Sequence, residues 1–146
     1  MFKKLLRTKD DLAVFILRVM LGIAFLPHGA QKVLGWFGGH GFNATMSSFV
    51  DKMHIPYIFA LLAILAESLG AIALITGFLT RIAAFGMAAV MAVAIYMVHG
   101  HNGFFMNWSG AQKGEGFEYH FLVLAIAIAL MIKGGGSFSI DRKISK

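Results

Sequence analysis

Four long apolar stretches constrain this chain more than any other feature of its sequence. They cover about residues 12–30, 57–79, 82–99 and 113–132. A helix needs roughly 20 mostly apolar residues to cross a bilayer, because its backbone polar groups must be bonded within the segment. Of the 146 residues, 58% are apolar and only 14% are charged. The sequence therefore predicts an all-α, polytopic protein: one membrane domain, residues 1–146, with four transmembrane helices in an antiparallel bundle.

The fourth stretch is the least regular of the four. Its uninterrupted apolar run, Tyr119 to Ile132, is too short to span. We expect its helix to begin near Lys113 and to carry Glu115, Glu118 and His120 into the outer part of the membrane. Acidic and imidazole side chains at that depth indicate a hydrated or ligand-filled pocket.

The basic residues predict the orientation, because lysine and arginine are retained on the cytoplasmic side. Nine flank one side of the spans: Lys3, Lys4, Arg7, Lys9, Arg81, Lys133, Arg142, Lys143 and Lys146. Three flank the other side: Lys32, Lys52 and Lys113. We therefore expect both termini to be cytoplasmic and the glycine-rich loops 31–56 and 100–116 to face outward and fold back over the bundle.

The two ends of the chain carry further signals. A basic start followed by an apolar segment also resembles a secretory signal, but with Met1 present we expect this segment to be retained as the first span. The glycine run 134–136 predicts the end of the last helix and a flexible tail.

Two compositional features exclude classes of function. The chain has no cysteine, which excludes disulfides, thiolate metal sites and a dithiol relay, so a redox role needs another carrier. The formal net charge is +6, but the basic residues lie at the membrane borders rather than in a groove-like patch. We therefore exclude nucleic acid as a partner.

Arg18 and Glu67 are the charged side chains placed deepest in the predicted spans. Such a charge costs about 2.5–3.5 kcal/mol at the bilayer centre, so each requires a partner or a role. Straight helices place Arg18 about 9 Å and Glu67 about 18 Å from the cytoplasmic border. One interpretation is a buried Arg18–Glu67 ion pair that fixes the helix register, with snorkelling of Arg18 as a variant. Another makes Glu67 a proton carrier or ligand contact.

All six histidines fall on the outer side of the predicted spans or in their outer half. His28, His99 and His120 lie at about 24, 25 and 18 Å by the same count. With Glu118, the pair His99 and His101 could join His120 in a metal site, or two histidines could bind haem. No recognised ligand spacing supports either, so haem and metal stay secondary interpretations.

Several motifs together resemble the DoxX family of small four-helix proteins of prokaryotic membranes. The first is Arg18-x3-Gly22-x4-Pro27-His28-Gly29-x2-Lys32. The second is Glu67-x2-Gly70, followed by Leu74-Ile75-Thr76-Gly77 and Thr80-Arg81; the third is Gly134-x-Gly136-x2-Ser139-x-Asp141. The resemblance implies polar motif residues at Arg18, His28, Lys32 and Glu67. It also implies a place in the cytoplasmic (inner) membrane and an association with quinone-linked oxidases, membrane oxidoreductase assemblies and oxidative-stress defence.

The leading functional hypothesis is an oxidoreductase-type protein, either a quinone-linked oxidoreductase or a subunit of one, that binds a quinone or similar lipophilic redox molecule in an outer-half pocket. The expected catalytic residues are Glu67 as proton exchanger and His28 and His120 as hydrogen-bonding pair. The expected cofactor contacts are Arg18, which would hold Glu67 ionised, with Lys32, His99, Phe25, Phe104 and Trp108.

Two alternatives remain open at the level of sequence. One is a non-catalytic membrane subunit or scaffold of a redox or stress-defence complex. The other is a small proton or solute transporter, which the midplane carboxylate favours and the absence of inverted repeats disfavours. The expected partners are the lipid bilayer and redox-enzyme proteins, and a homo-oligomer also remains open.

Overall fold

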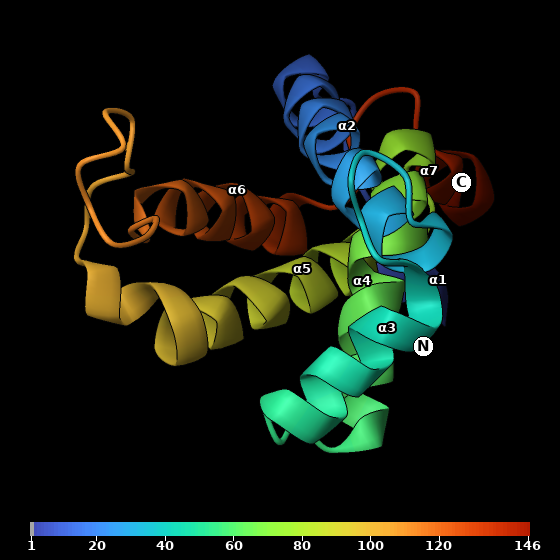
Figure 1. The fold of residues 1–146 in the computed structure, drawn as a ribbon. Helices are drawn as coiled ribbons and strands as arrows, with labels where there is room; N and C mark the ends of the chain where they lie inside the picture. The colour runs from blue at the N-terminus through green and yellow to red at the C-terminus, as the bar shows by residue number, and fades with distance from the viewer. Residues whose placement is uncertain (1) are drawn as a thin grey trace.

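A computed structural model describes residues 2–146, except for the side chains of Phe2 and Lys4, so Met1 and the expected cytoplasmic position of the Lys4 side chain lie outside the described part. Within that part every regular element is helical (Figure 1). The elements are α1 Phe2–Leu6, α2 Leu12–Leu34, α3 Gly41–Ser47, η1 Ser48–Lys52, α4 Tyr57–Thr76, α5 Thr80–Ala94, η2 Ile95–His99, η3 Gly100–Asn102, α6 Glu118–Lys133 and α7 Ile140–Ser145.

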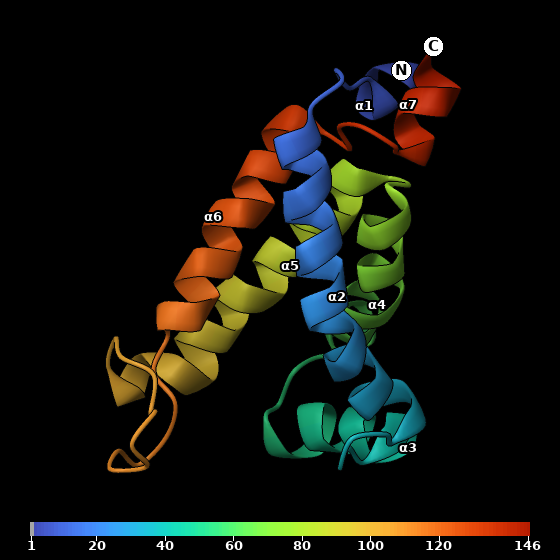
Figure 2. The same cartoon turned by 90° about the horizontal axis from the view of Figure 1, so that it is seen from above.

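Three of the helices are long and apolar enough to cross a membrane. They are α2, α4 and the continuous segment Thr80–Asn102, with mean hydropathies of 1.9, 2.5 and 2.0. Helix α6 has 16 residues and rises about 24 Å, against roughly 30 Å for the hydrocarbon layer. Its sequence is largely apolar, and the helix lies alongside α5 in both views (Figures 1 and 2).

The long helices form two pairs, α2 with α4 and α5 with α6 (Figure 2). The pairs meet near α1, α7 and both chain termini, which we call the terminal end, and they diverge toward the opposite end. That opposite, loop end carries α3, η1 and residues 103–117. The wedge between the two pairs positions the candidate site.

Helices α2 and α4 approach each other closely enough for backbone contact, through two glycines of α2. A Cβ on Gly22 would lie 2.7 Å from the carbonyl oxygen of Ala71, and one on Gly29 would lie 2.6 Å from that of Glu67. Small residues at such contacts let the helix backbones approach closely. In lipid, helices associate through this close packing because no hydrophobic driving force brings them together. The glycine spacing of seven residues places both contacts on one face of α2.

Arg18 does not pair with Glu67, so this part of the prediction is wrong. The guanidinium is fully buried at the terminal end and donates four hydrogen bonds to backbone carbonyls. The acceptors are Gly135 O at 2.7 Å, Leu74 O at 2.8 Å, Ile75 O at 2.6 Å and Ser137 O at 3.1 Å. Two acceptors lie in the last turn of α4, where carbonyls lack their regular i+4 partners, although Leu74 O also accepts from the amide of Gly77 at 3.3 Å. A guanidinium fork can satisfy several such carbonyls at once.

The glycine run 134–136 ends α6 as expected, but it is buried and bonded rather than flexible. Gly135 accepts from Arg18, and the amide of Gly136 donates to the Thr8 hydroxyl at 2.9 Å. Farther along, the Asp141 carboxylate accepts from the amides of Leu79 and Thr80 at 2.7 and 2.8 Å. The C-terminal segment therefore closes the start of α5 as well as the end of α4.

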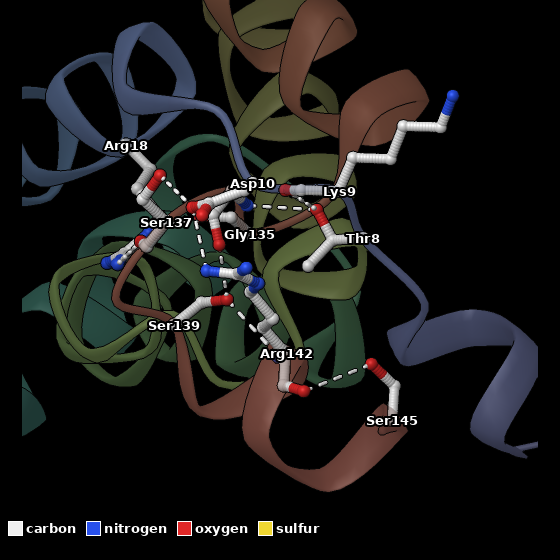
Figure 3. Close-up of polar contacts among 10 residues, drawn as sticks. Thr8, Lys9, Asp10, Arg18, Gly135, Ser137, Ser139, Arg142 and Ser145 are labelled. Atoms are coloured by element: carbon white, nitrogen blue, oxygen red, sulfur yellow. Dashed lines mark hydrogen bonds and ion pairs between the residues drawn. The ribbon is translucent and has the colours of Figure 1, made fainter.

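Polar contacts also join the C-terminal segment to the approach to α2 (Figure 3). The Ser137 hydroxyl donates to Asp10 at 2.6 Å, and Arg142 forms an ion pair with Asp10 at 2.7 Å. The Ser137 hydrogen bond and the nearby Arg142 charge hold the pKa of the Asp10 carboxyl below its ordinary value. Because that pKa is lowered, this contact stabilises the fold at neutral pH and is lost as the solution is acidified.

Helix boundaries depart from expectation at three places. Helix α2 continues to Leu34, four residues past its expected end, so Lys32 lies on the helix and not in a loop. Helix α4 ends at Thr76, because Gly77 takes φ +70° and Phe78 N donates back to Ala73 O. Helix α6 begins at Glu118, so the prediction of a start near Lys113 is wrong. Backbone bonds from Phe117 N to Gly103 O and from Glu118 N to Phe104 O hold residues 103–117 as a loop.

Substitution of Gly29 should separate α2 from α4. We expect Gly29→Ala to destabilise the protein by about 1–3 kcal/mol, since the new methyl group meets backbone atoms that cannot move aside. The control is Gly70→Ala in α4, where a Cβ would meet only Leu65 O at 3.8 Å. It should be neutral or stabilising, because alanine favours a helix by up to about 1 kcal/mol. Thermal unfolding in detergent micelles measures both, and equal losses would contradict the contact.

Replacement of Arg18 by lysine should destabilise the terminal end although the charge is kept. An ammonium has three donors without a planar fork, so it cannot reproduce four bonds, and each lost bond to a charged group is worth about 1.5–3 kcal/mol. Arg142→Lys is the control, since its exposed ion pair is worth at most about 1 kcal/mol. An Arg18→Lys protein with the melting temperature of Arg142→Lys would refute this role.

Candidate functional site

A cavity of about 300 Å³, here called the central cavity, lies between the two helix pairs. It is lined by Phe25, His28 and Lys32 of α2, Glu67 of α4, Met91 and Ala94 of α5, His99 of η2, Met106 and Glu115 of the 103–117 loop, and Tyr119 and His120 of α6. Every long helix contributes to its wall. Six of the nine predicted site residues line it: Glu67, His28, His120, Lys32, His99 and Phe25.

The polar centre of the cavity is an ion pair between the Lys32 ammonium and the Glu67 carboxylate. The side chains are 22% and 7% exposed, respectively, so the carboxylate is nearly enclosed. The pair depends on the close approach of α2 to α4, because Gly29 lies against the Glu67 backbone one turn before Lys32. Lys32 therefore takes the partner role that the sequence had assigned to Arg18.

Two imidazoles form another part of the wall. The ring centroids of His99 and His120 are 4.1 Å apart. His99 Nδ1 donates to the carbonyl of Glu115 at 2.9 Å, which ties the end of η2 to the loop before α6. His120 is 7% exposed, and its Nδ1 has no hydrogen-bond partner among the described residues. A buried imidazole nitrogen without a protein partner is costly, so His120 is the wall residue best placed to bond a ligand in this cavity.

The remaining wall is apolar and aromatic. Phe25 is 2% exposed and stacks on Tyr119 with ring centroids 6.3 Å apart and an interplanar angle of 28°. The exposed His28 ring lies 5.8 Å from Phe25. Met91 and Met106 add flexible apolar surface. The cavity thus places an ion pair and imidazoles beside flat apolar surfaces, the arrangement typical of pockets for small aromatic ligands.

Three predicted contacts lie elsewhere. Arg18 is bonded at the terminal end, as described above. Phe104 packs against Phe105 and Phe117, with ring centroids 5.4 and 5.3 Å away. Trp108 is 88% exposed at the tip of the loop. Both aromatic residues belong to a loop whose path the helical periodicity of the sequence could not predict.

Sequence reasoning also missed several residues of the cavity wall. Met91 and Ala94 are three apart on α5 and so share a face, but neither residue type carries a chemical signal. Tyr119 and Met106 also line the cavity but were not among the expected site residues. A metal site gains no support, since the described residues contain no group of three potential histidine or acidic ligands. His101, expected to join His99 in such a site, is exposed and does not line the cavity.

Removal of the Glu67 charge should reveal the ion pair. Glu67→Gln leaves the Lys32 ammonium without its carboxylate, and we expect a loss of about 1–3 kcal/mol of stability, reduced from the fully buried case because Lys32 retains some exposure. Adding Lys32→Met should restore part of the loss, because both charges are then gone. Asp51→Asn, in an exposed contact with Ser47, is the control. Strictly additive losses in thermal unfolding would exclude the coupling.

Comparison with known proteins supports the resemblance seen in the motifs. A DoxX family model matches residues 13–100, which include Arg18 and the Lys32–Glu67 pair. The chain is 28% identical to inner membrane protein YqjF of Escherichia coli (strain K12) over 137 residues, covering 94% of this chain and 95% of that protein. No solved structure matches the present chain significantly. With its long apolar helices, the present chain is a multi-pass protein of the inner membrane. The chain belongs to the DoxX family.

Proposed function

We propose that the protein spans the inner membrane four times, with the terminal end in the cytoplasm. The distribution of lysine and arginine supports this orientation, since nine of 13 flank the terminal end. Helix α6 begins and ends beside α5, and its first turn follows a loop of aromatic side chains suited to the headgroup layer. Under this orientation the central cavity lies in the outer half of the membrane.

We further propose that the central cavity binds a quinone or similar lipophilic redox molecule. The observation that carries this proposal is the wall itself: a buried imidazole without a partner and an ammonium–carboxylate pair face a stacked Phe25–Tyr119 wall. A volume of about 300 Å³ is at the lower end for ligand pockets, enough for a ring headgroup whose tail remains in lipid. Donors and flat apolar surface both fit such a headgroup.

A bound quinone would supply the exchange of two electrons and two protons. This chain would supply position and proton handling. The Lys32 ammonium and the imidazoles of His28 and His120 can donate hydrogen bonds to ring oxygens, and Phe25 can pack against the ring face. Glu67 can accept a proton while Lys32 keeps it oriented. The chain has no cysteine, so the electrons would pass to or from a redox-enzyme partner.

Filling the cavity tests this proposal. Ala94→Phe places a ring inside the central cavity, whereas Ala92→Phe places the same ring on the exposed face of α5. We expect a short-tailed quinone to raise the melting temperature of the wild type and Ala92→Phe in detergent. Ala94→Phe should lose the response, with affinity lowered at least about tenfold.

A chemical control accompanies these variants. Solvent extracts of the purified wild type should contain quinone, and extracts of Ala94→Phe should not. The proposal is refuted if the wild-type extract contains no quinone and added quinone does not shift the melting temperature. A non-catalytic membrane subunit would then be the better description.

A further inference from the structure

A second cavity, here called the loop cavity, lies at the loop end between the last turns of α2 and the α3–η1 segment. Its volume is about 290 Å³. It is lined by Gln31, Lys32, Gly38, Gly39, His40, Ala44, Thr45, Ser48 and Phe49. Lys32 is the residue it shares with the central cavity. The two spaces therefore share part of their wall.

Among the described residues, those that line the loop cavity include several hydrogen-bond donors and no carboxylate. Thr45 lines the cavity and is 9% exposed. Ser48, one turn later, also lines the cavity and is half-buried. The nearby Asp51 carboxylate is engaged by Ser47. Thr45 and Ser48 therefore place two hydroxyl-bearing side chains in the same cavity wall as Lys32, where hydroxyl and ammonium donors could serve one anionic group.

We propose that the loop cavity binds a phosphate group, held by the Lys32 ammonium and the hydroxyls of Thr45 and Ser48. An ammonium carries three N–H donors, and Lys32 gives one to Glu67, so donors remain for a second acceptor. Lysine binds phosphate as a point charge, and hydroxyls complete the shell of such sites. The phosphate can belong to a phospholipid headgroup or be free inorganic phosphate.

The position of the cavity suits a headgroup. Trp36 and Phe37, beside its glycines, are 60% and 68% exposed, and aromatic side chains of this kind concentrate at headgroup level. The volume has room for roughly ten water molecules, so it can hold a phosphate together with the first atoms of its ester.

Sharing Lys32 couples the two cavities. This part rests on the proposed function, because it requires a quinone in the central cavity. A phosphate drawn toward Lys32 changes the position of the ammonium relative to Glu67 and to any ligand beside them. By thermodynamic linkage, phosphate must change the affinity for quinone by the same factor as quinone changes the affinity for phosphate.

The test measures binding to the full chain in detergent by calorimetry. The probes are short-chain phosphatidic acid, the matching diacylglycerol, which lacks only the phosphate, and inorganic phosphate. We expect phosphatidic acid to bind at least about tenfold more tightly than diacylglycerol. Tight binding of phosphatidic acid alone identifies a headgroup site, and comparable binding of inorganic phosphate identifies a free-anion site.

Adjacent serines provide a matched pair of variants. Ser48→Ala and Thr45→Val should each weaken binding of the phosphate probe by about five- to tenfold, whereas Ser47→Ala, whose side chain does not line the cavity, should leave it unchanged. Equal binding of phosphatidic acid and diacylglycerol, or equal effects of Ser48→Ala and Ser47→Ala, would overturn the proposal. Short-tailed quinone added to Thr45→Val without phosphate should bind as to wild type, so failure of either site is seen separately.

Discussion

Helix α2 carries two cations, Arg18 within its apolar span and Lys32 near its outer end, and the arrangement of the other elements depends on how each is satisfied. A charge in the membrane interior needs a partner within the protein. Arg18 finds backbone carbonyls at the end of α4 and in the C-terminal segment. Lys32 finds the Glu67 carboxylate. Both partners require α4 to lie directly against α2, which the glycines at positions 22 and 29 make possible.

Arg18 and Lys32 are bonded in different ways, so the two ends of the molecule differ in structure. At the terminal end, a planar guanidinium with four acceptors joins α2, α4 and the chain after α6 into one closed structure. Toward the loop end the helix pairs diverge, and the Lys32–Glu67 pair is left at the edge of a cavity. The hydrogen bonds at the terminal end fix the helices relative to one another. A site between the diverging pairs would therefore hold its side chains in a fixed geometry.

Family motifs acquire separate physical meanings in this structure. Gly22 and Gly29 serve helix contact, and Arg18, Gly136 and Asp141 serve closure of the terminal end. Of the polar motif residues, His28, Lys32 and Glu67 alone reach the central cavity. A family resemblance treats all of them alike, whereas the contacts separate residues that hold the fold from residues available to a ligand.

The sequence by itself determined the helical class, three of the four expected apolar spans and most polar residues of the central cavity, because hydropathy and residue depth depend on local periodicity. It did not determine which charges pair. Straight-helix counts place Lys32 about 12 Å above Glu67. In the structure Gly29 packs against the Glu67 backbone, so Lys32, one turn later, is within reach of the carboxylate. The C-terminal segment, the start of α6 and the placement of Phe104 and Trp108 were likewise decided by long-range contacts. Glycine-rich segments carry no periodic signal, and only the tertiary structure shows which carbonyls and side chains they meet.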